Sequence, residues 1–297
     1  MARKVDTGHT LSGSLAGIVN DIRVRSLKYM AQEGVLKGTV TPVGVGQKGN
    51  AVTEPNWDPT GRSEVVATEG IRFTAYASYV SATKKYTSVE RAHGTVLTYN
   101  VIEDASESVR DEHARAHGIV HAIGLEKQIS AVFASFTTNT VSASGKGTGS
   151  RPYGLTLPAV AQARAKLTGQ VQAFTGPFSL AVNHAAQYYL WNSLTHNPEY
   201  GPTGSLGDKL LDKYYAGTLL GDVRVFYSNA GITQSGTGAT VALYEKGSIG
   251  LFMPRPMRME TDHDIDLRGY KVLSTRRAGA RVRMEKAGCN ITTLTRL

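Results

Sequence analysis

Three histidines have the spacing most suggestive of chemistry in this sequence. His113, His117 and His121 recur at every fourth residue, which places them on one face of a helix. Two histidines spaced in this way can share a metal ion. The stretch contains no cysteine and no obvious carboxylate on the same face, so we favour a polar or subunit-facing stripe. We therefore predict no metal site here.

Three aspartates are the second candidate for a metal site. Asp262, Asp264 and Asp266 match the first ligands of an EF-hand calcium loop. That loop requires glycine at its sixth position and glutamate at its twelfth, where this chain has Leu267 and Leu273. The match therefore breaks down, and we predict no calcium site.

An extended strand explains the same aspartates better. From Met257 to Arg268, charged side chains occupy every second position, as they would on one face of a strand. A second strand is expected after Gly279. The segment that returns alongside the first strand carries Arg276, Arg277, Arg281 and Arg283, whose positive charges can face the acids. We expect both strands to contact neighbouring copies of the chain. The candidate contact residues are Arg258, Asp262, Asp264, Asp266, Arg268, Arg281 and Arg283.

Motifs for catalysis and for cofactor binding are missing. Gly145-Lys146-Gly147 is similar to a phosphate-binding loop, but that loop requires Ser or Thr directly after the lysine. No G-x-S-x-G, H-E-x-x-H or C-x-x-C sequence occurs. We therefore expect neither an enzyme nor a bound cofactor, and an uncharacterised hydrolase is the weaker alternative.

The composition indicates a folded protein with basic ends. The chain has 297 residues, a single cysteine and no apolar stretch near the ~18 residues that would cross a bilayer. Its first residues lack a signal-peptide stretch, so we expect an intracellular origin and no membrane contact. Residues 1–48 and 255–297 carry the net charge of +9, and the middle is neutral. Basic ends favour contact with nucleic acid or with acids on neighbouring subunits.

The expected elements are an arm, a loop, a long helix and a mixed domain. Residues 11–32 have the periodicity of an amphipathic helix. Residues 38–70 are rich in glycine and proline and cannot form a core, and residues 71–89 return as a strand. The longest helix is expected at about 105–136, and glycine-rich residues 142–154 mark a domain boundary. Alternating helices and strands follow.

This order of parts resembles the major capsid proteins of tailed double-stranded-DNA bacteriophages, which have the Hong Kong 97-type fold. FTAYASYVSATKKY resembles the return of that family's extended loop, and VRDEHARAHGIVHAIGLEKQISAVFASF resembles its spine helix. FSLAVNHAAQYYLWNSL is similar to a strand and helix of the axial domain, and YKVLSTRRAGARVRMEKAGCNITT to the closing strands. The resemblance rests on the order and spacing of these segments over nearly the whole chain.

The resemblance implies an α+β, Hong Kong 97-like capsid fold with four parts. These would be an N-terminal arm (1–37), an extended loop (38–92), a peripheral domain with the spine helix (93–150 and 255–297) and an axial domain (151–254). The loop would contact neighbouring subunits, with candidate residues Trp57, Arg62 and Glu69. Lys48 also lies in the loop, but no crosslinking partner can be assigned to it, so no crosslink is inferred.

The implied function is that of a structural shell subunit. Copies would form hexamers and pentamers of an icosahedral head in the virion, assembled in the host bacterial cytoplasm, with packaged double-stranded DNA on the inner face. Further partners would be a portal and, in some relatives, a cement protein. Because the arm starts at Met1, a separate scaffolding protein is implied. Two alternatives stay open: an encapsulin-like bacterial compartment with the same fold, and a basic nucleic-acid-binding protein.

Overall fold

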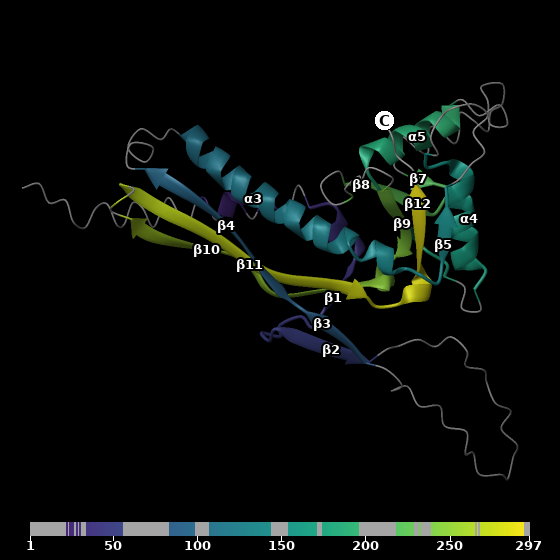
Figure 1. Cartoon of the computed structure of the whole chain (residues 1–297), viewed down its shortest axis with the longest axis horizontal. Coiled ribbons are helices and arrows are strands. Elements are labelled where there is room, and N and C mark those ends of the chain that lie inside the picture. The colour runs from purple at the N-terminus through teal and green to yellow at the C-terminus, as the bar shows by residue number, and fades with distance from the viewer. Residues whose placement is uncertain are drawn as a thin grey trace, which may run out of the picture.

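The structure is a computed structural model of the whole chain (Figure 1). Statements about structure concern only the residues that it describes, which are 22, 24–26, 28, 30, 34–55, 83–98, 107–143, 154–170, 174–195, 218–228, 232, 239–264, 266 and 268–293.

A long, narrow sheet forms one side of the molecule (Figure 1). Its strand order is β1 (Thr41–Val43), β10 (Ile249–Asp264), β11 (Gly269–Val282) and β4 (Val89–Thr98). β10 and β11 form an antiparallel ribbon, to which β4 adds antiparallel and β1 adds parallel. β10 contains Pro254 and Pro256, which cannot donate ladder hydrogen bonds, and its register shifts on both sides of Arg255.

The charged alternation predicted from Met257 to Arg268 ends earlier than expected. β10 stops at Asp264, and Asp266 lies in the turn before β11. The backbone amide of Asp266 donates to Asp264 Oδ1 at 3.0 Å, and Arg268 has a positive φ of 45°. An aspartate that bonds the amide two residues on favours a turn over a continuing strand. Asp266 and Arg268 are therefore turn residues, and the prediction that they belong to the strand face is wrong.

The spine helix α3 (Glu107–Ser130) lies along the long sheet (Figure 1). The helix predicted to reach residue 136 ends at Ser130, and the 3-10 turn η2 (Phe133–Ser135) follows. The rings of Phe133 and Phe136 lie against Tyr244, with centroid distances of 5.4 and 6.5 Å. Both rings are buried at this point, where the chain has left the α-helical path. No helix in the described part of the chain is long and apolar enough to span a membrane.

The carboxylate of Glu285 connects the segment after η2 with the C-terminal part of the chain. Glu285, at the start of the 3-10 turn η4 (Glu285–Ala287), accepts hydrogen bonds from the amides and hydroxyls of Thr137 and Thr138 at 2.5–3.3 Å. These donors, the Thr137 hydroxyl first, lower the pKa of Glu285 below its ordinary value. The contact joins segments that are 147 to 148 residues apart.

A six-stranded sheet with two helices forms the other end of the molecule (Figure 1). Its strand order is β5 (Thr140–Ser142), β12 (Gly288–Thr293), β9 (Ala239–Glu245), β6 (Phe178–Val182), β8 (Val223–Tyr227) and β7 (Thr218–Leu219). The helices are α4 (Leu157–Thr168) and α5 (His184–Thr195). β6 lies at the centre and is buried at every position, as its run of apolar side chains dictates.

The sheets divide the chain differently from the predicted domain ranges. β5 and β12 lie in ranges assigned to the peripheral domain (93–150 and 255–297), yet both belong to the six-stranded sheet with β9 and β6. Cys289 and Ile291 on β12 are buried in one core cluster with residues of α4. The domain boundary near residue 255 therefore does not separate the two sheets, because the last strand returns to the axial elements.

The extended loop leaves the body as a two-stranded ribbon (Figure 1). β2 (Ala51–Pro55) pairs antiparallel with β3 (Thr83–Thr87), with Ala51 opposite Thr87 and Pro55 opposite Thr83. Over residues 83–87 this pairing agrees with the return strand predicted at 71–89, and residues 71–82 of that prediction lie outside the described residues. Residues 56–82, which connect β2 to β3 in the sequence, lie outside the described residues.

Candidate assembly interface

The base of the extended loop is anchored by a small apolar cluster. Val52 on β2 and Tyr86 on β3 pack with Val43 on β1 and Phe252 on β10, and all four side chains are buried. Gly250 lets the Tyr86 ring lie close to β10, because a Cβ at that position would be 2.7 Å from Tyr86 Cε1. Burial raises the pKa of the Tyr86 hydroxyl to about 12.

Polar contacts surround this cluster and connect the loop to β11. Arg283 Nε lies 3.3 Å from Glu54 Oε2, and Lys84 Nζ donates to the carbonyl of Arg283 at 2.7 Å. Arg281 Nη1 donates to the carbonyl of Lys85 at 2.7 Å. Both arginines were candidates for contacts between subunits, and here they bind the loop of their own chain. A role between subunits stays a prediction for them.

Glu90 and Gly279 bring the strands together just beyond the loop. Arg255 and Arg277 face each other across β10 and β11, and both form ion pairs with Glu90 on β4. A Cβ at Gly279 would lie 2.0 Å from the carbonyl oxygen of Thr87, so only glycine permits this close approach. Gly279 lies inside β11, which begins ten residues before the strand start predicted from the sequence.

The acidic face of β10 is balanced by a lysine rather than by arginines. Asp262 lies opposite Lys271 in the ladder, and Lys271 forms an ion pair with Asp264. The hydrogen bond from Lys271 to Asp264 raises the pKa of that lysine. Arg258 pairs with Glu260 on its own strand at 3.2 Å. The expected cations lie farther along β11 or just beyond it, at Arg276, Arg277, Arg281 and Arg283.

A groove of about 530 Å³ runs across the same face of the sheet. Val272 and Thr95 contact the α3 side, because Val272 is buried with Ala114 of α3 and the Thr95 hydroxyl lies 2.9 Å from His117 Nε2. Their neighbours point the other way. The half-exposed Val96 and Leu273 line the groove, together with Gly94, Glu260, Asp262 and Lys271. This face offers an apolar floor with a charged rim, which suits contact with protein.

A buried carboxylate joins three parts of the molecule. Glu126 on α3 is 4% exposed. Its Oε1 accepts hydrogen bonds from the amides of Val35 (2.7 Å) and Leu36 (3.4 Å), where the 3-10 turn η1 (Leu36–Thr39) begins. Its Oε2 accepts from Ser228 Oγ at 2.6 Å, just after β8. Sequence reasoning missed this residue, because a glutamate in a helix is usually exposed.

Two histidines of the predicted polar or subunit-facing stripe are buried inside their own subunit. His117 and His121 are 0% and 2% exposed and lie between α3 and the long sheet. Within the described residues, no three His, Cys, Asp or Glu side chains gather as metal ligands. The absence of a required metal stays a prediction.

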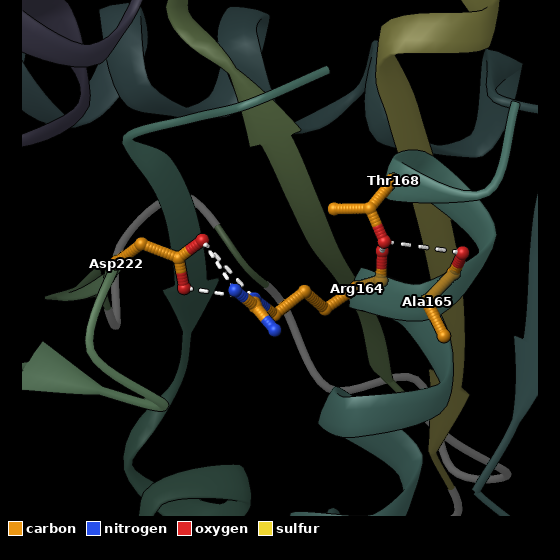
Figure 2. Close-up of polar contacts among 4 residues, drawn as sticks. All are labelled: Arg164, Ala165, Thr168 and Asp222. Atoms are coloured by element: carbon orange, nitrogen blue, oxygen red, sulfur yellow. Dashed lines mark hydrogen bonds and ion pairs between the residues drawn. The ribbon is translucent and has the colours of Figure 1, made fainter. Parts of the chain in front are cut away.

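The axial end contains a bidentate ion pair (Figure 2). Arg164 on α4 donates from Nε to both carboxylate oxygens of Asp222 (2.8 and 3.0 Å) and from Nη2 to Oδ2 (3.0 Å). Asp222 precedes β8, and its carbonyl accepts the amide of Phe178 at 3.1 Å. The pair therefore fixes α4 against the sheet.

Trp57, Arg62 and Glu69, the loop candidates, lie outside the described residues.

Comparison with solved structures identifies the fold. No protein-family model and no curated protein matches the chain. The capsid of an empty GTA particle superimposes with a TM-score of 0.65 at 12% identity, over 89% of this chain and 90% of that chain. A chain of Mycobacterium phage Che8 gives 0.62 at 17% identity, over 87% of this chain and 90% of its own. The chain has the capsid fold of tailed bacteriophages.

The Hong Kong 97-type fold predicted from the order of segments is thus confirmed. A virus-like particle from Pyrococcus furiosus shares this capsid fold more distantly, with a TM-score of 0.56 at 10% identity, over 92% of this chain and 98% of that chain. In each comparison the alignment covers about nine-tenths of both chains or more.

Proposed function

We propose that the chain is a major capsid protein of a tailed bacteriophage. Copies form the hexamers and pentamers of an icosahedral head that encloses double-stranded DNA. The observation that carries this proposal is the match of nearly the entire chain, in both directions, to a phage capsid subunit and to the capsid of a GTA particle. A separate enzyme or DNA-binding domain added to this fold would leave a large part of this chain unmatched, whereas the alignments cover about nine-tenths of both chains.

The mechanism is geometric. The loop base is anchored by an apolar cluster and by the Glu54–Arg283 ion pair, so the ribbon β2–β3 leaves the body at a fixed angle. A rigid projection that contacts a different surface on the next copy makes a heterologous contact, and such contacts close into rings. The proposed contacts are Trp57, Arg62 and Glu69, which fall between β2 and β3 in the sequence, and Arg258 and Asp262 on the exposed sheet face.

The remaining partners follow from this role. The subunit works in the virion after assembly in the bacterial cytoplasm, with a separate scaffolding protein, a portal and a cement protein as further partners, and with DNA on the inner face of the shell. It performs no catalysis and needs no cofactor or metal.

Electron microscopy of the expressed chain tests the proposal. The chain alone, or with the scaffolding protein encoded beside it, is expected to form closed shells. A variant in which a short Gly-Ser link replaces residues 56–82 should keep the β2–β3 pairing and remain folded by circular dichroism, but fail to close shells. Glu112→Ala, on the exposed face of α3, serves as the assembling control. Closed shells from the truncated chain would refute the loop's role, and a parent that stays monomeric would refute the shell itself.

A protein-filled compartment is the second candidate, and the likeness to a virus-like particle from Pyrococcus furiosus favours it. Nuclease-treated particles from an infected or induced host distinguish the two. Protected DNA of uniform length supports the phage head, whereas an enzyme cargo without DNA supports the compartment. Tight, salt-sensitive DNA binding by a monomer would favour the nucleic-acid-binding alternative.

A further inference from the structure

Two buried histidines share one serine hydroxyl between the spine helix and the long sheet. His117 Nδ1 lies 2.7 Å from Ser274 Oγ, and His121 Nε2 lies 2.8 Å from the same atom. Ser274 on β11 is itself 0% exposed and donates to the carbonyl of His93 on β4 at 3.1 Å. The other nitrogen of His117 lies 2.9 Å from the hydroxyl of Thr95. The contact between α3 and the sheet is thus polar at its centre.

The hydrogen-bond inventory fixes the protonation of this cluster. A serine hydroxyl has one proton and accepts two hydrogen bonds. Because Ser274 gives its proton to the His93 carbonyl, both histidines must donate N–H to Ser274 Oγ. His117 therefore carries its proton on Nδ1, and its Nε2 accepts from the Thr95 hydroxyl. Ser274 thus has every site filled while both rings are neutral, and a further proton on His117 Nε2 would force Thr95 to reverse its hydrogen bond.

Each element that packs against the two histidine rings contributes basic side chains. β11 contributes Arg276, which is 1% exposed. Its Nη2 donates to Gln128 Oε1 at 3.3 Å, while its Nε and Nη1 have no hydrogen-bond partner among the described residues. β4 contributes Arg91 and His93, whose ring centroid is 4.9 Å from that of His117. α3 contributes His113. Asp111, earlier on α3, is paired with Arg25 of the N-terminal helix at 3.4 Å.

We propose that this cluster makes the contact between the spine helix and the sheet sensitive to acid. A proton that enters the His117–Ser274–His121 group adds a second positive charge beside the uncompensated Arg276. The repulsion and the lost hydrogen bond release α3 from β4 and β11. This response belongs to the single subunit, so it holds whether or not the chain forms a shell.

The direction of the effect follows from the titration of the two histidines. Burial first, and then basic neighbours (His93 for His117, Arg276 for His121), lower the pKa of both residues to about 4. An exposed histidine has a pKa of about 6.5, so the open state takes up protons that the closed state refuses. The contact is therefore stable above about pH 6.5, and each histidine raises its opening constant by up to about tenfold per pH unit as the pH falls toward 4.

Hydrogen–deuterium exchange of the full-length chain tests the proposal. After correction for the intrinsic rate, the opening constant of α3 residues 114–125 should rise at least about 100-fold between pH 6.5 and pH 4.5, while α4 keeps its protection. The double variant His117→Asn with His121→Gln keeps an N–H at each donor position and cannot titrate, so its rise should fall below about tenfold. His184→Gln, an exposed site on α5, is the matched control and should behave like the parent. An equal rise in the double variant and the parent would overturn the proposal.

A second measurement covers the case in which the double variant does not fold. Exchange of the imidazole Cε1 hydrogens, read by mass spectrometry, gives the pKa of each histidine in the parent. His117 and His121 should each titrate at least one pH unit below about 6.5, the ordinary histidine value. Titration of both near pH 6.5 would refute the acid-sensitive contact without any variant.

Discussion

Removal of the Glu126 carboxylate should weaken the junction between the spine helix, the N-terminal segment and β8. In Glu126→Ala, the amides of Val35 and Leu36 and the hydroxyl of Ser228 lose their acceptor. A hydrogen bond to a charged group contributes about 1.5–3 kcal/mol, and two of these three are short. Part of the stability lost with these hydrogen bonds is regained in the variant, because no carboxylate has to be desolvated on folding. We expect a net loss of about 2–4 kcal/mol.

Matched variants separate this effect from a general change in the helix. Glu126→Gln keeps an oxygen for Val35 and an N–H that can donate to Ser228 Oγ, so it should cost only about 1 kcal/mol. Glu112→Ala, on the exposed face of the same helix, should change stability by less than about 0.5 kcal/mol.

Scanning calorimetry can resolve these differences. The entropy of unfolding is about 2.1 cal/mol/K per residue, which gives roughly 0.6 kcal/mol/K for 297 residues. Glu126→Ala should therefore lower Tm by about 3–7 °C, Glu126→Gln by about 2 °C and Glu112→Ala by less than about 1 °C. Equal Tm values for the two alanine variants would show that the carboxylate contributes nothing at this junction.

Three further substitutions probe the loop base, the core and the η4 contact. Gly279→Ala should lower the free energy of unfolding by about 1–3 kcal/mol and speed proteolysis of the extended loop, since the added Cβ meets a backbone carbonyl. Gly38→Ala, which has open space around it, should be neutral. Similar proteolysis of the two variants would contradict the close approach at Gly279. Tyr244→Phe should lose about 1 kcal/mol in denaturant unfolding, because its hydroxyl lies 2.6 Å from Thr39 Oγ1; an unchanged midpoint would mean that this bond adds no stability. Glu285→Gln should cost about 1 kcal/mol at pH 7. The deficit should shrink as the pH falls below about 4.3, the ordinary glutamate value, and vanish below the lowered folded-state pKa of Glu285, because protonation removes the stabilising effect of this carboxyl. A deficit that does not depend on pH would refute the charge-assisted contact.

The order of elements was accessible from the sequence because it depends on local pattern. The Gly/Pro-rich loop, its returning strand and the long helix each have a composition that one window reveals. The four-residue spacing of the histidines placed them on one helix face, but it did not tell that His117 and His121 are buried inside their own subunit. Fold class followed from the sum of these local signals.

Long-range pairing was not accessible in the same way. Arg276 looks like a surface charge in the sequence, yet it is buried. The pairing register of β11 with β4 decides which arginine of β11 points toward α3. Likewise, no local signal assigns β12 to the six-stranded sheet, and none tells that Lys271 rather than an arginine faces Asp262. One-residue differences in register reverse which face a side chain occupies, and sequence patterns alone do not fix the register.

The position of the β10–β11 ribbon in the long sheet has a consequence for synthesis of the chain. β1 and β4 are made early, yet both are separated in the sheet by strands that begin at Ile249 and Gly269. At about 5–20 residues per second, the ribosome needs roughly 10–30 seconds to pass from Thr98 to Ile249. Throughout that interval the spine helix has no completed sheet to pack on, and the base of the extended loop lacks Phe252, Arg281 and Arg283. A nascent chain therefore cannot present its loop in the orientation of the finished chain until β10 and β11 have been made.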